Sequence, residues 1–254
     1  MSRIWAYIRY VLEAKGIHGA HSPFIFDLFN HVFNDERHYY AFERIERRRN
    51  LLLKKEDEIE VEDLGAGSRK IKSSTRKLSD IARTSLKRPK YARMLFRLCT
   101  HLERKEILEF GTSLGITTAY LASTGAQVVT VEGAQSIHAE AALVMQALKL
   151  EAILINSSFN EYLIELGAER KFDLIFIDGH HEGKALLHYA TELLPHLSSD
   201  GVMVIDDINW SSDMQEAWAQ LITWDDFDLS LDLFELGLLF RREGMVKQHH
   251  VIRY

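Results

Sequence analysis

Short apolar segments alternate with helical segments from about residue 100 onwards, and this alternation restricts the fold more than any other feature of the chain. Segments such as 174–177 are apolar on both faces, which is typical of strands in a buried parallel sheet. The alternation therefore predicts an α/β fold with a Rossmann-like, doubly wound and mostly parallel sheet. We predict strands at 106–110, 127–132, 152–156, 172–178 and 202–206, and helices at 116–123, 136–148, 161–166 and 184–197.

The last predicted strands interrupt this alternation. Residues 228–234 and 237–242 both have strand character, and the connection between them is too short for a helix. Two strands joined so tightly must run antiparallel. We therefore expect an antiparallel C-terminal strand on the otherwise parallel sheet.

The first hundred residues predict helices instead. We predict a helix at the start of the chain and a third helix over about 36–55. Between them, Ser22 and Pro23 have the residue types that begin a second helix. The acidic stretch 54–63 is expected to be a surface connection. We predict a helical N-terminal region or lid over 1–100 and a sheet-containing domain over 101–254. The stripe predicted for the first helix consists of Ile4, Tyr7, Ile8, Val11 and Leu12, and that of the second of Ile25, Leu28, Phe29, Val32 and Phe33.

Aromatic side chains are concentrated in the first 45 residues. They are too many for a simple surface layer, so the N-terminal helices are expected to pack on the domain, on a second copy of the chain, or on both.

Cys99 is the only cysteine, which excludes an intrachain disulfide framework and a cysteine-based zinc site. Arg3 and Arg9 interrupt the apolar residues of the opening segment, so it predicts neither a signal peptide nor a membrane span. We therefore expect a cytoplasmic protein without a membrane partner.

The net charge of −6 is unevenly distributed. Residues 69–97 contain eleven basic residues and one acid, Asp80. Such a segment either binds an anionic partner or forms a solvated helix face.

Two glycine-containing segments have the composition of a loop that binds a nucleotide. The segment 63–68 follows a charged stretch, and no acid stands about 20 residues later, so an ordinary turn is the better interpretation. The segment 109–115, GluPheGlyThrSerLeuGly, follows an apolar strand and opens an apolar helix, and the next strand ends at Glu132. The sequence context therefore favours the segment 109–115 as the loop that binds a nucleotide.

The segment 109–115, the acid Glu132, the strand 172–178 and the reversed terminal strands together resemble the class I S-adenosylmethionine-dependent methyltransferases. The resemblance covers about 100–254, whereas the glycine pattern of dinucleotide-binding dehydrogenases is absent. It implies S-adenosylmethionine as cofactor, with Glu132 at the ribose. The other cofactor-binding residues that it implies are Glu109, Gly111, Thr112, Ser113 and Gly115 around the methionine end, Ser157 and Ser158 near adenine, and Asp178.

Three aspartates follow two strands that should be neighbours. Asp178 ends one strand, and Asp206 and Asp207 end the next, so their side chains are expected at the same edge of the sheet. Converging carboxylates suit a hard cation such as Mg²⁺ or Ca²⁺, although any one of them can simply cap a helix. The cluster thus points to a divalent metal site.

This cluster resembles the metal-dependent O-methyltransferases of the catechol, caffeoyl-coenzyme A and macrolide-sugar type. The resemblance implies Asp178, Asp206 and Asp207 as metal ligands, with Mg²⁺ as the expected ion. His181 stands at the position of the base in the sugar-hydroxyl relatives, and we assign it, with Asp178, to catalysis.

The leading hypothesis is a metal-assisted O-methylation of a small hydroxylated acceptor, which the basic lid suggests is acidic or phosphorylated. The alternatives are an RNA methyltransferase that uses the segment 69–97 to bind phosphate, and a non-catalytic binding protein on the same fold. Nucleic acid is the less favoured partner, because no known RNA-binding module is recognisable.

Overall fold

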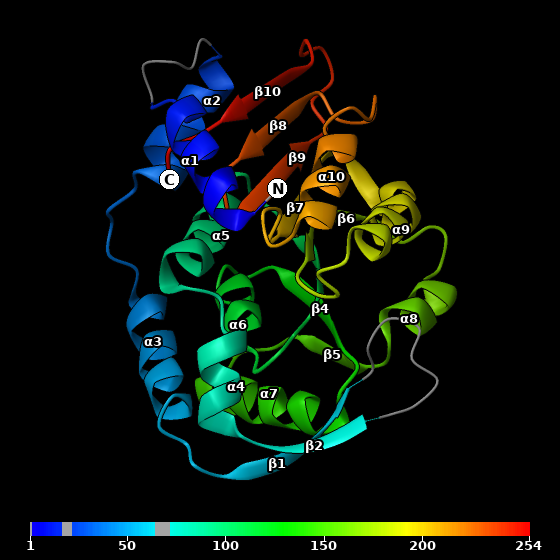
Figure 1. Ribbon diagram of the computed structural model, residues 1–254. Coiled ribbons are helices and arrows are strands. Elements are labelled where there is room, and N and C mark those ends of the chain that lie inside the picture. The colour runs from blue at the N-terminus through cyan, green and yellow to red at the C-terminus, as the bar shows by residue number, and fades with distance from the viewer. Residues whose placement is uncertain (1, 17–21, 64–71) are drawn as a thin grey trace. The chain divides into compact units, whose positions relative to one another are not determined.

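A computed structural model of the protein describes residues 2–16, 22–63 and 72–254 (Figure 1). The chain divides into two compact units. Unit 1 consists of Met1–Asp35 and Gly167–Tyr254, and unit 2 consists of Glu36–Leu166. These units do not follow the division expected at residue 100, and the covering role expected for residues 1–100 stays a prediction.

Unit 2 is built on three parallel strands, β3 (Glu106–Phe110), β4 (Gln127–Glu132) and β5 (Ile153–Asn156), paired in that order. The central residues of β3 and β4 are buried, as expected for apolar strands between layers of helices. Its helices are α3 (Tyr40–Leu52), α4 (Leu78–Ser85), α5 (Pro89–His101), α6 (Ile116–Ala122), α7 (Gln135–Leu148) and α8 (Phe159–Glu165).

Unit 1 contains a mixed sheet of five strands in the order β10, β8, β9, β7, β6. The strands are β6 (Phe172–Ile177), β7 (Leu197–Asp206), β8 (Leu229–Asp232), β9 (Leu236–Phe240) and β10 (Gln248–Val251). The helical segments of this unit are α1 (Arg3–Glu13), α2 (Pro23–Leu28), a π-helical turn at Phe29–Phe33, α9 (Gly183–Leu193), a short 3₁₀ turn at Leu194–His196 and α10 (Ser212–Leu221).

The pairing in this sheet confirms the expected reversal of the terminal strands. β6 and β7 are parallel, while β9 is antiparallel to both β7 and β8. The strand β10, parallel to β8, was not predicted, because four partly polar residues give no strand pattern. With the parallel strands of both units, the α/β prediction of a mostly parallel, Rossmann-like sheet is confirmed.

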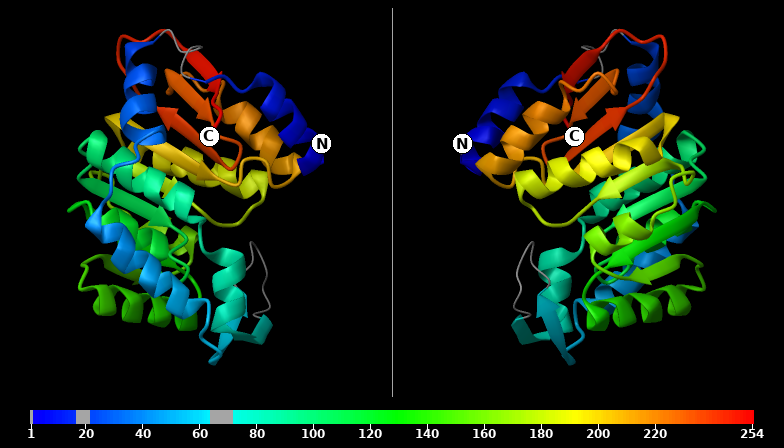
Figure 2. Two further views of the ribbon diagram at one scale, coloured as in Figure 1. Left: turned by 90° about the vertical axis from the view of Figure 1, so that its left-hand side faces the viewer. Right: turned by 90° about the vertical axis from the view of Figure 1, so that its right-hand side faces the viewer.

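A hairpin in unit 2 contradicts the prediction of helices alone in the first hundred residues. Strands β1 (Glu58–Asp63) and β2 (Lys72–Lys77) pair antiparallel, with Glu58 opposite Lys77, where a surface connection was expected (Figure 2). Opposite charges on facing strands stabilise such a pair, yet they produce no apolar alternation in the sequence. The prediction of helices alone was therefore wrong for this segment.

The two predicted apolar stripes differ in their burial. The stripe of the second helix is buried throughout, as its spacing predicted. In α1, by contrast, Ala6, Tyr10 and Ala14 are buried, and all five residues of the predicted stripe are exposed. Within the described residues, no helix is both long and apolar enough to cross a membrane.

Candidate functional site

The segment between β3 and α6 forms a tight loop in unit 2. Gly111 and Gly115 have positive φ angles of 100° and 75°, which side chains other than glycine rarely adopt. The N–H of Gly111 donates to the carbonyl of Val131 at 3.0 Å, so the loop is held against β4. Gly115 precedes the first residue of α6, where backbone N–H groups favour an anionic ligand group.

Gly115 also allows two helices of unit 2 to approach closely. A Cβ atom at this position would lie 3.2 Å from both Cα and Cβ of Ala141 in α7. Glycine is therefore required here for two reasons, its backbone conformation and the contact with α7.

Glu132, the last residue of β4, connects this loop to the next one. Its Oε2 accepts the N–H of Ser113 at 2.9 Å, and its Oε1 accepts the N–H of Ala134 at 3.0 Å. Burial raises the pKa of the Glu132 carboxyl, and these backbone hydrogen bonds partly oppose the increase. The carboxylate is thus fixed in orientation and keeps lone pairs for the hydroxyl groups of a ribose.

Glu109 is completely buried at the end of β3. Its Oε2 accepts the hydroxyls of Thr118 at 2.5 Å and Thr130 at 2.8 Å, and the hydroxyls of Thr112 and Thr130 are 2.6 Å apart. This network makes the base of the loop rigid. The implied contact of Glu109 and Thr112 with the cofactor stays a prediction.

Ser157 and Ser158 follow β5. The N–H of Ser157 donates to the carbonyl of Glu132 at 3.2 Å, which keeps this turn beside the ribose acid. Ser158 caps α8: its hydroxyl accepts the N–H of Glu161, whose carboxylate accepts the N–H of Ser158. The helix cap accounts for Ser158 without a ligand, and the adenine contact of both serines stays a prediction.

A contact from α4 reaches the loop, and the sequence did not indicate it. The hydroxyls of Ser85 and Ser113 are 2.8 Å apart, and Ser113 has a positive φ of 47°. Ser113 is therefore held from two sides, by Ser85 through its hydroxyl and by Glu132 through its N–H. Two serines 28 positions apart carry no signal of such pairing.

In unit 1 the parallel pairing of β6 and β7 brings the three aspartates to one edge of the sheet. Ile177 is paired with Ile205, so Asp178 and Asp206 occupy equivalent positions just beyond this pair. Asp206 is almost completely buried, and Asp207 turns away from the strand with a positive φ of 50°. Strained backbone of this kind is frequent at functional sites.

The two neighbouring histidines have different surroundings. Nδ1 of His180 lies 2.7 Å from the hydroxyl of Tyr189, a contact that ties this ring to α9. Nδ1 of His181 lies 3.7 Å from Oδ2 of Asp207, and its ring centre is 5.9 Å from that of Trp210. The His181 side chain is about one third exposed, and its role as a base stays a prediction.

Asn209 and Trp210 complete this edge. Asn209 is buried and donates to the carbonyl of Phe234 at 2.9 Å, which is a structural role. Trp210 is 52% exposed, with the guanidinium carbon of Arg3 5.2 Å from its ring centre. Trp210 is therefore a surface platform beside His181 and not a core residue.

The chemistry of the carboxylate donors fits a hard divalent cation. In the described side-chain positions, however, the oxygens of Asp178, Asp206 and Asp207 do not form a group lying within 4.8 Å of one another. A bound cation would have to bring them closer together. The predicted metal site is thus compatible with the residue types and remains a proposal.

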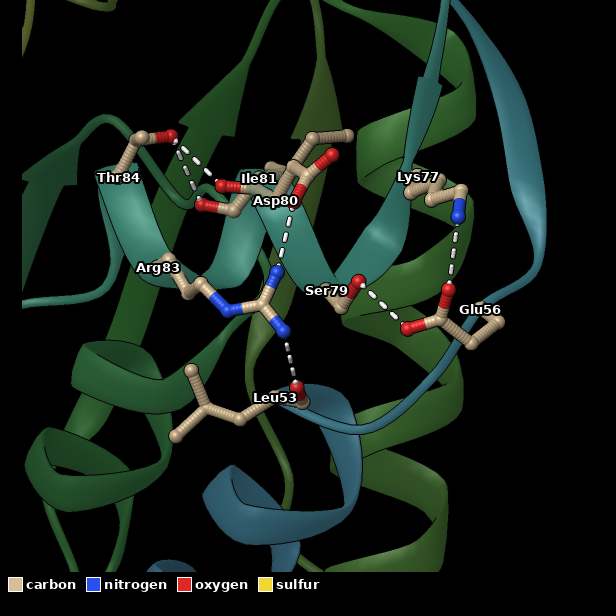
Figure 3. Close-up of polar contacts among 8 residues, drawn as sticks. All are labelled: Leu53, Glu56, Lys77, Ser79, Asp80, Ile81, Arg83 and Thr84. Atoms are coloured by element: carbon tan, nitrogen blue, oxygen red, sulfur yellow. Dashed lines mark hydrogen bonds and ion pairs between the residues drawn. The ribbon is translucent and has the colours of Figure 1, made fainter.

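The basic segment is partly used in contacts within unit 2 (Figure 3). Lys77 pairs with Glu56 at 2.9 Å, and Arg83 pairs with Asp80 at 2.7 Å. Arg97 is buried, and Arg93 lies over the ring of Phe42. Only part of the predicted positive charge therefore remains for a partner. Arg69 and Lys70, the glycines of 64–68, and His18 and His21 lie outside the described residues.

The fold and the loop agree with a family model that matches part of the chain. Unit 1 contains the reversed strand β9, and in unit 2 the glycine loop follows β3 and an acid ends the next strand, β4. Residues 108–208 match the family model of a methyltransferase domain. These residues therefore form a region similar to methyltransferase domains.

Solved structures similar to this chain are methyltransferases with low sequence identity. A putative O-methyltransferase from Klebsiella pneumoniae is 16% identical with a TM-score of 0.56, and the match covers 82% of this chain and 92% of that one. The methyltransferase PaMTH1 from Podospora anserina, bound to S-adenosylhomocysteine, is 17% identical with a TM-score of 0.58. This match covers 83% of this chain and 91% of that one. TomG, an O-methyltransferase from Streptomyces achromogenes in complex with S-adenosylmethionine, is 17% identical with a TM-score of 0.54. This match covers 63% of this chain and 82% of TomG. No curated protein matches the chain significantly in sequence.

The close approach at Gly115 predicts a specific loss of stability. Gly125 also has a positive φ, 84°, but a Cβ there would meet nothing within 4 Å. Gly125→Ala is expected to lower the free energy of unfolding by about 1 kcal/mol, through backbone strain alone. Gly115→Ala should cost about 2–4 kcal/mol, because overpacking against Ala141 adds to the strain. Urea denaturation measures both, and equal losses would contradict the packing argument.

The raised pKa of Glu132 predicts that cofactor affinity falls on acidification. The ionised carboxylate is the stronger acceptor for ribose hydroxyls, and it is lost when pH falls through the pKa of Glu132, which lies above the ordinary value of 4.5. Calorimetric titration of S-adenosylmethionine at several pH values measures this decrease. The charge of His138 also acts on Glu132, so His138→Gln is the control for histidine titration. An unchanged pH dependence in Glu132→Gln would refute the assignment.

Proposed function

We propose that this protein is a methyltransferase that transfers the methyl group of S-adenosylmethionine to an oxygen of a small hydroxylated acceptor, with His181 as the base. The observation that carries the proposal is the arrangement of His181, Asp207 and Trp210 at the edge of the sheet in unit 1. Oδ2 of Asp207 lies 3.7 Å from Nδ1, beyond hydrogen-bond distance, and the proposal assigns Nε2 to the acceptor hydroxyl.

The reaction is a single displacement. As the hydroxyl proton passes to Nε2 of His181, the acceptor oxygen forms a bond to the methyl carbon and the bond between this carbon and sulfur breaks. S-adenosylhomocysteine leaves with the electron pair of that bond. The protein's contribution is to orient the reactants, to exclude water and to receive the proton.

A divalent cation, most suitably Mg²⁺, is part of the proposal. Asp178, Asp206 and Asp207 would hold it, and when bound it would lower the pKa of the acceptor hydroxyl. Support comes from the donor chemistry of three carboxylates at one edge of the sheet.

The acceptor is proposed to be small and to carry an acidic group. The exposed ring of Trp210 offers a flat apolar contact, and Arg3 beside it offers a positive charge. The partial use of the basic segment within unit 2 favours a small acceptor over RNA, since fewer cations remain to bind phosphates.

A cytoplasmic location is also proposed, consistent with a single, buried cysteine.

The test of the proposed base is His181→Gln. We expect the rate of S-adenosylhomocysteine release to fall by about 10²–10⁴-fold, as is usual when a general base is lost. A panel of phenols and hydroxy acids serves as acceptors, and calorimetry should show unchanged affinity for S-adenosylmethionine. His188→Gln, an exposed histidine on α9, is the matched control and should retain activity. Full activity of His181→Gln would exclude this role.

The proposed cation predicts that Mg²⁺ itself binds to the aspartates. Calorimetric titration with MgCl₂ should give a binding signal for the unmodified protein and none for Asp178→Ala or Asp207→Ala. The same two variants should lose turnover and keep nearly full affinity for S-adenosylmethionine. Asp226→Ala, which removes an acid paired with Arg241 elsewhere on unit 1, is the control. Full turnover in the presence of a chelator would exclude the metal but not the methyl transfer.

A further inference from the structure

Helix α1 presents a continuous apolar face to solvent. Six of its eleven residues are large apolar or aromatic side chains that are exposed: Ile4 (74%), Trp5 (63%), Tyr7 (53%), Ile8 (41%), Val11 (42%) and Leu12 (81%). At 3.6 residues per turn they occupy a sector of about 160° around the helix. Exposed apolar residues are ordinary when scattered, whereas a continuous face of this kind marks an interaction site.

The face is not the result of a loosely attached helix. On the opposite side Ala6, Tyr10 and Ala14 are buried against Phe234. The hydroxyl of Tyr10 donates to the carbonyl of Ile252 at 2.6 Å and accepts the N–H of Tyr254 at 2.9 Å. The chain after α1 is also held, because the N–H of Lys15 donates to the carbonyl of Val251 at 2.9 Å. The helix is therefore held by its buried side, which includes Ala6 and Tyr10, and its broader apolar face is exposed to solvent.

The charges next to this face are mainly positive. Arg9, Lys15 and Arg253 are exposed, and the guanidinium of Arg253 lies 3.4 Å from the carbonyl of Val11. The sequence of α1 contains one acid, Glu13. This local charge is opposite in sign to the net charge of the chain, −6.

We propose that α1 lies on an anionic lipid surface, with its apolar face in the boundary between headgroups and acyl chains. Short helices with an apolar, aromatic-containing face and flanking arginine or lysine residues bind membranes in this orientation. Tryptophan and tyrosine favour the same interfacial depth, which suits Trp5 and Tyr7. With eleven residues α1 is too short to span a bilayer, and this proposal departs from the expectation that the protein has no membrane partner.

A second copy of the chain is the competing occupant of this face. A symmetric contact between two α1 helices would bring Arg9, Lys15 and Arg253 of each copy toward the same cations of the other. Glu13 in the helix, Glu235 beside Arg3 and Asp232 near Arg9 would offset only part of this repulsion. An anionic bilayer attracts the same cations, at about 1 kcal/mol for each lysine or arginine.

The test uses the full chain and sedimentation with lipid vesicles. We expect binding to vesicles of phosphatidylcholine mixed with phosphatidylglycerol, weakening as salt increases, and little binding to phosphatidylcholine alone. Leu12→Asp should reduce the partition coefficient at least about tenfold, because it places a charge in the apolar face. Val246→Asp is the matched control: Val246 is 78% exposed and lies outside α1, so this variant should bind like the unmodified protein.

A charge variant tests the second half of the proposal. Arg9→Glu should also weaken binding to anionic vesicles about tenfold, whereas Lys54→Glu, at an exposed cation of unit 2, should not. Thermal melting should show that all four variants fold, since each changed side chain is exposed.

Three results would overturn the proposal. The first is no sedimentation of the unmodified protein with anionic vesicles. The second is an equal loss of binding in Leu12→Asp and Val246→Asp. The third, from light scattering, is a dimer that Leu12→Asp dissociates, together with no vesicle binding, which would assign the face to a second copy of the chain.

Discussion

The backbone hydrogen bonds to the Glu132 carboxylate hold two loops of unit 2 together. They join the loop after β3, through Ser113, to the turn after β4, through Ala134. Without them two neighbouring strand ends would present separate loops, and the ribose acid would rotate freely. Burial raises the pKa of this carboxyl, and the backbone hydrogen bonds partly oppose the increase.

The same principle, strand ends brought together by parallel pairing, organises the acceptor side in unit 1. The register of Ile177 with Ile205 places Asp178 beside Asp206, and the positive φ of Asp207 turns the chain toward His181. Both halves of the proposed chemistry thus use the carboxyl ends of parallel strands, where backbone groups and side chains converge on a ligand.

Sequence reasoning succeeded where a local pattern and the tertiary environment agree. The strands 106–110 and 127–132 were predicted with their observed bounds, because buried parallel strands are apolar on both faces. It failed at the β1–β2 hairpin, whose strands are polar and charged and show no apolar alternation. It failed again at α1, because periodicity shows that a helix has an apolar side but not whether that side is buried.

The sequence by itself determined the fold class, the glycine loop and its acid, and the three aspartates at strand ends, since each depends on residue type and order along the chain. Only the tertiary structure shows how the surroundings of the two histidines differ, because His180 contacts Tyr189 while Nδ1 of His181 lies 3.7 Å from Asp207. It also decided that Ser85 supports the loop and that α1 faces outward. These are contacts or exposures that arise between distant segments, and no local pattern encodes them.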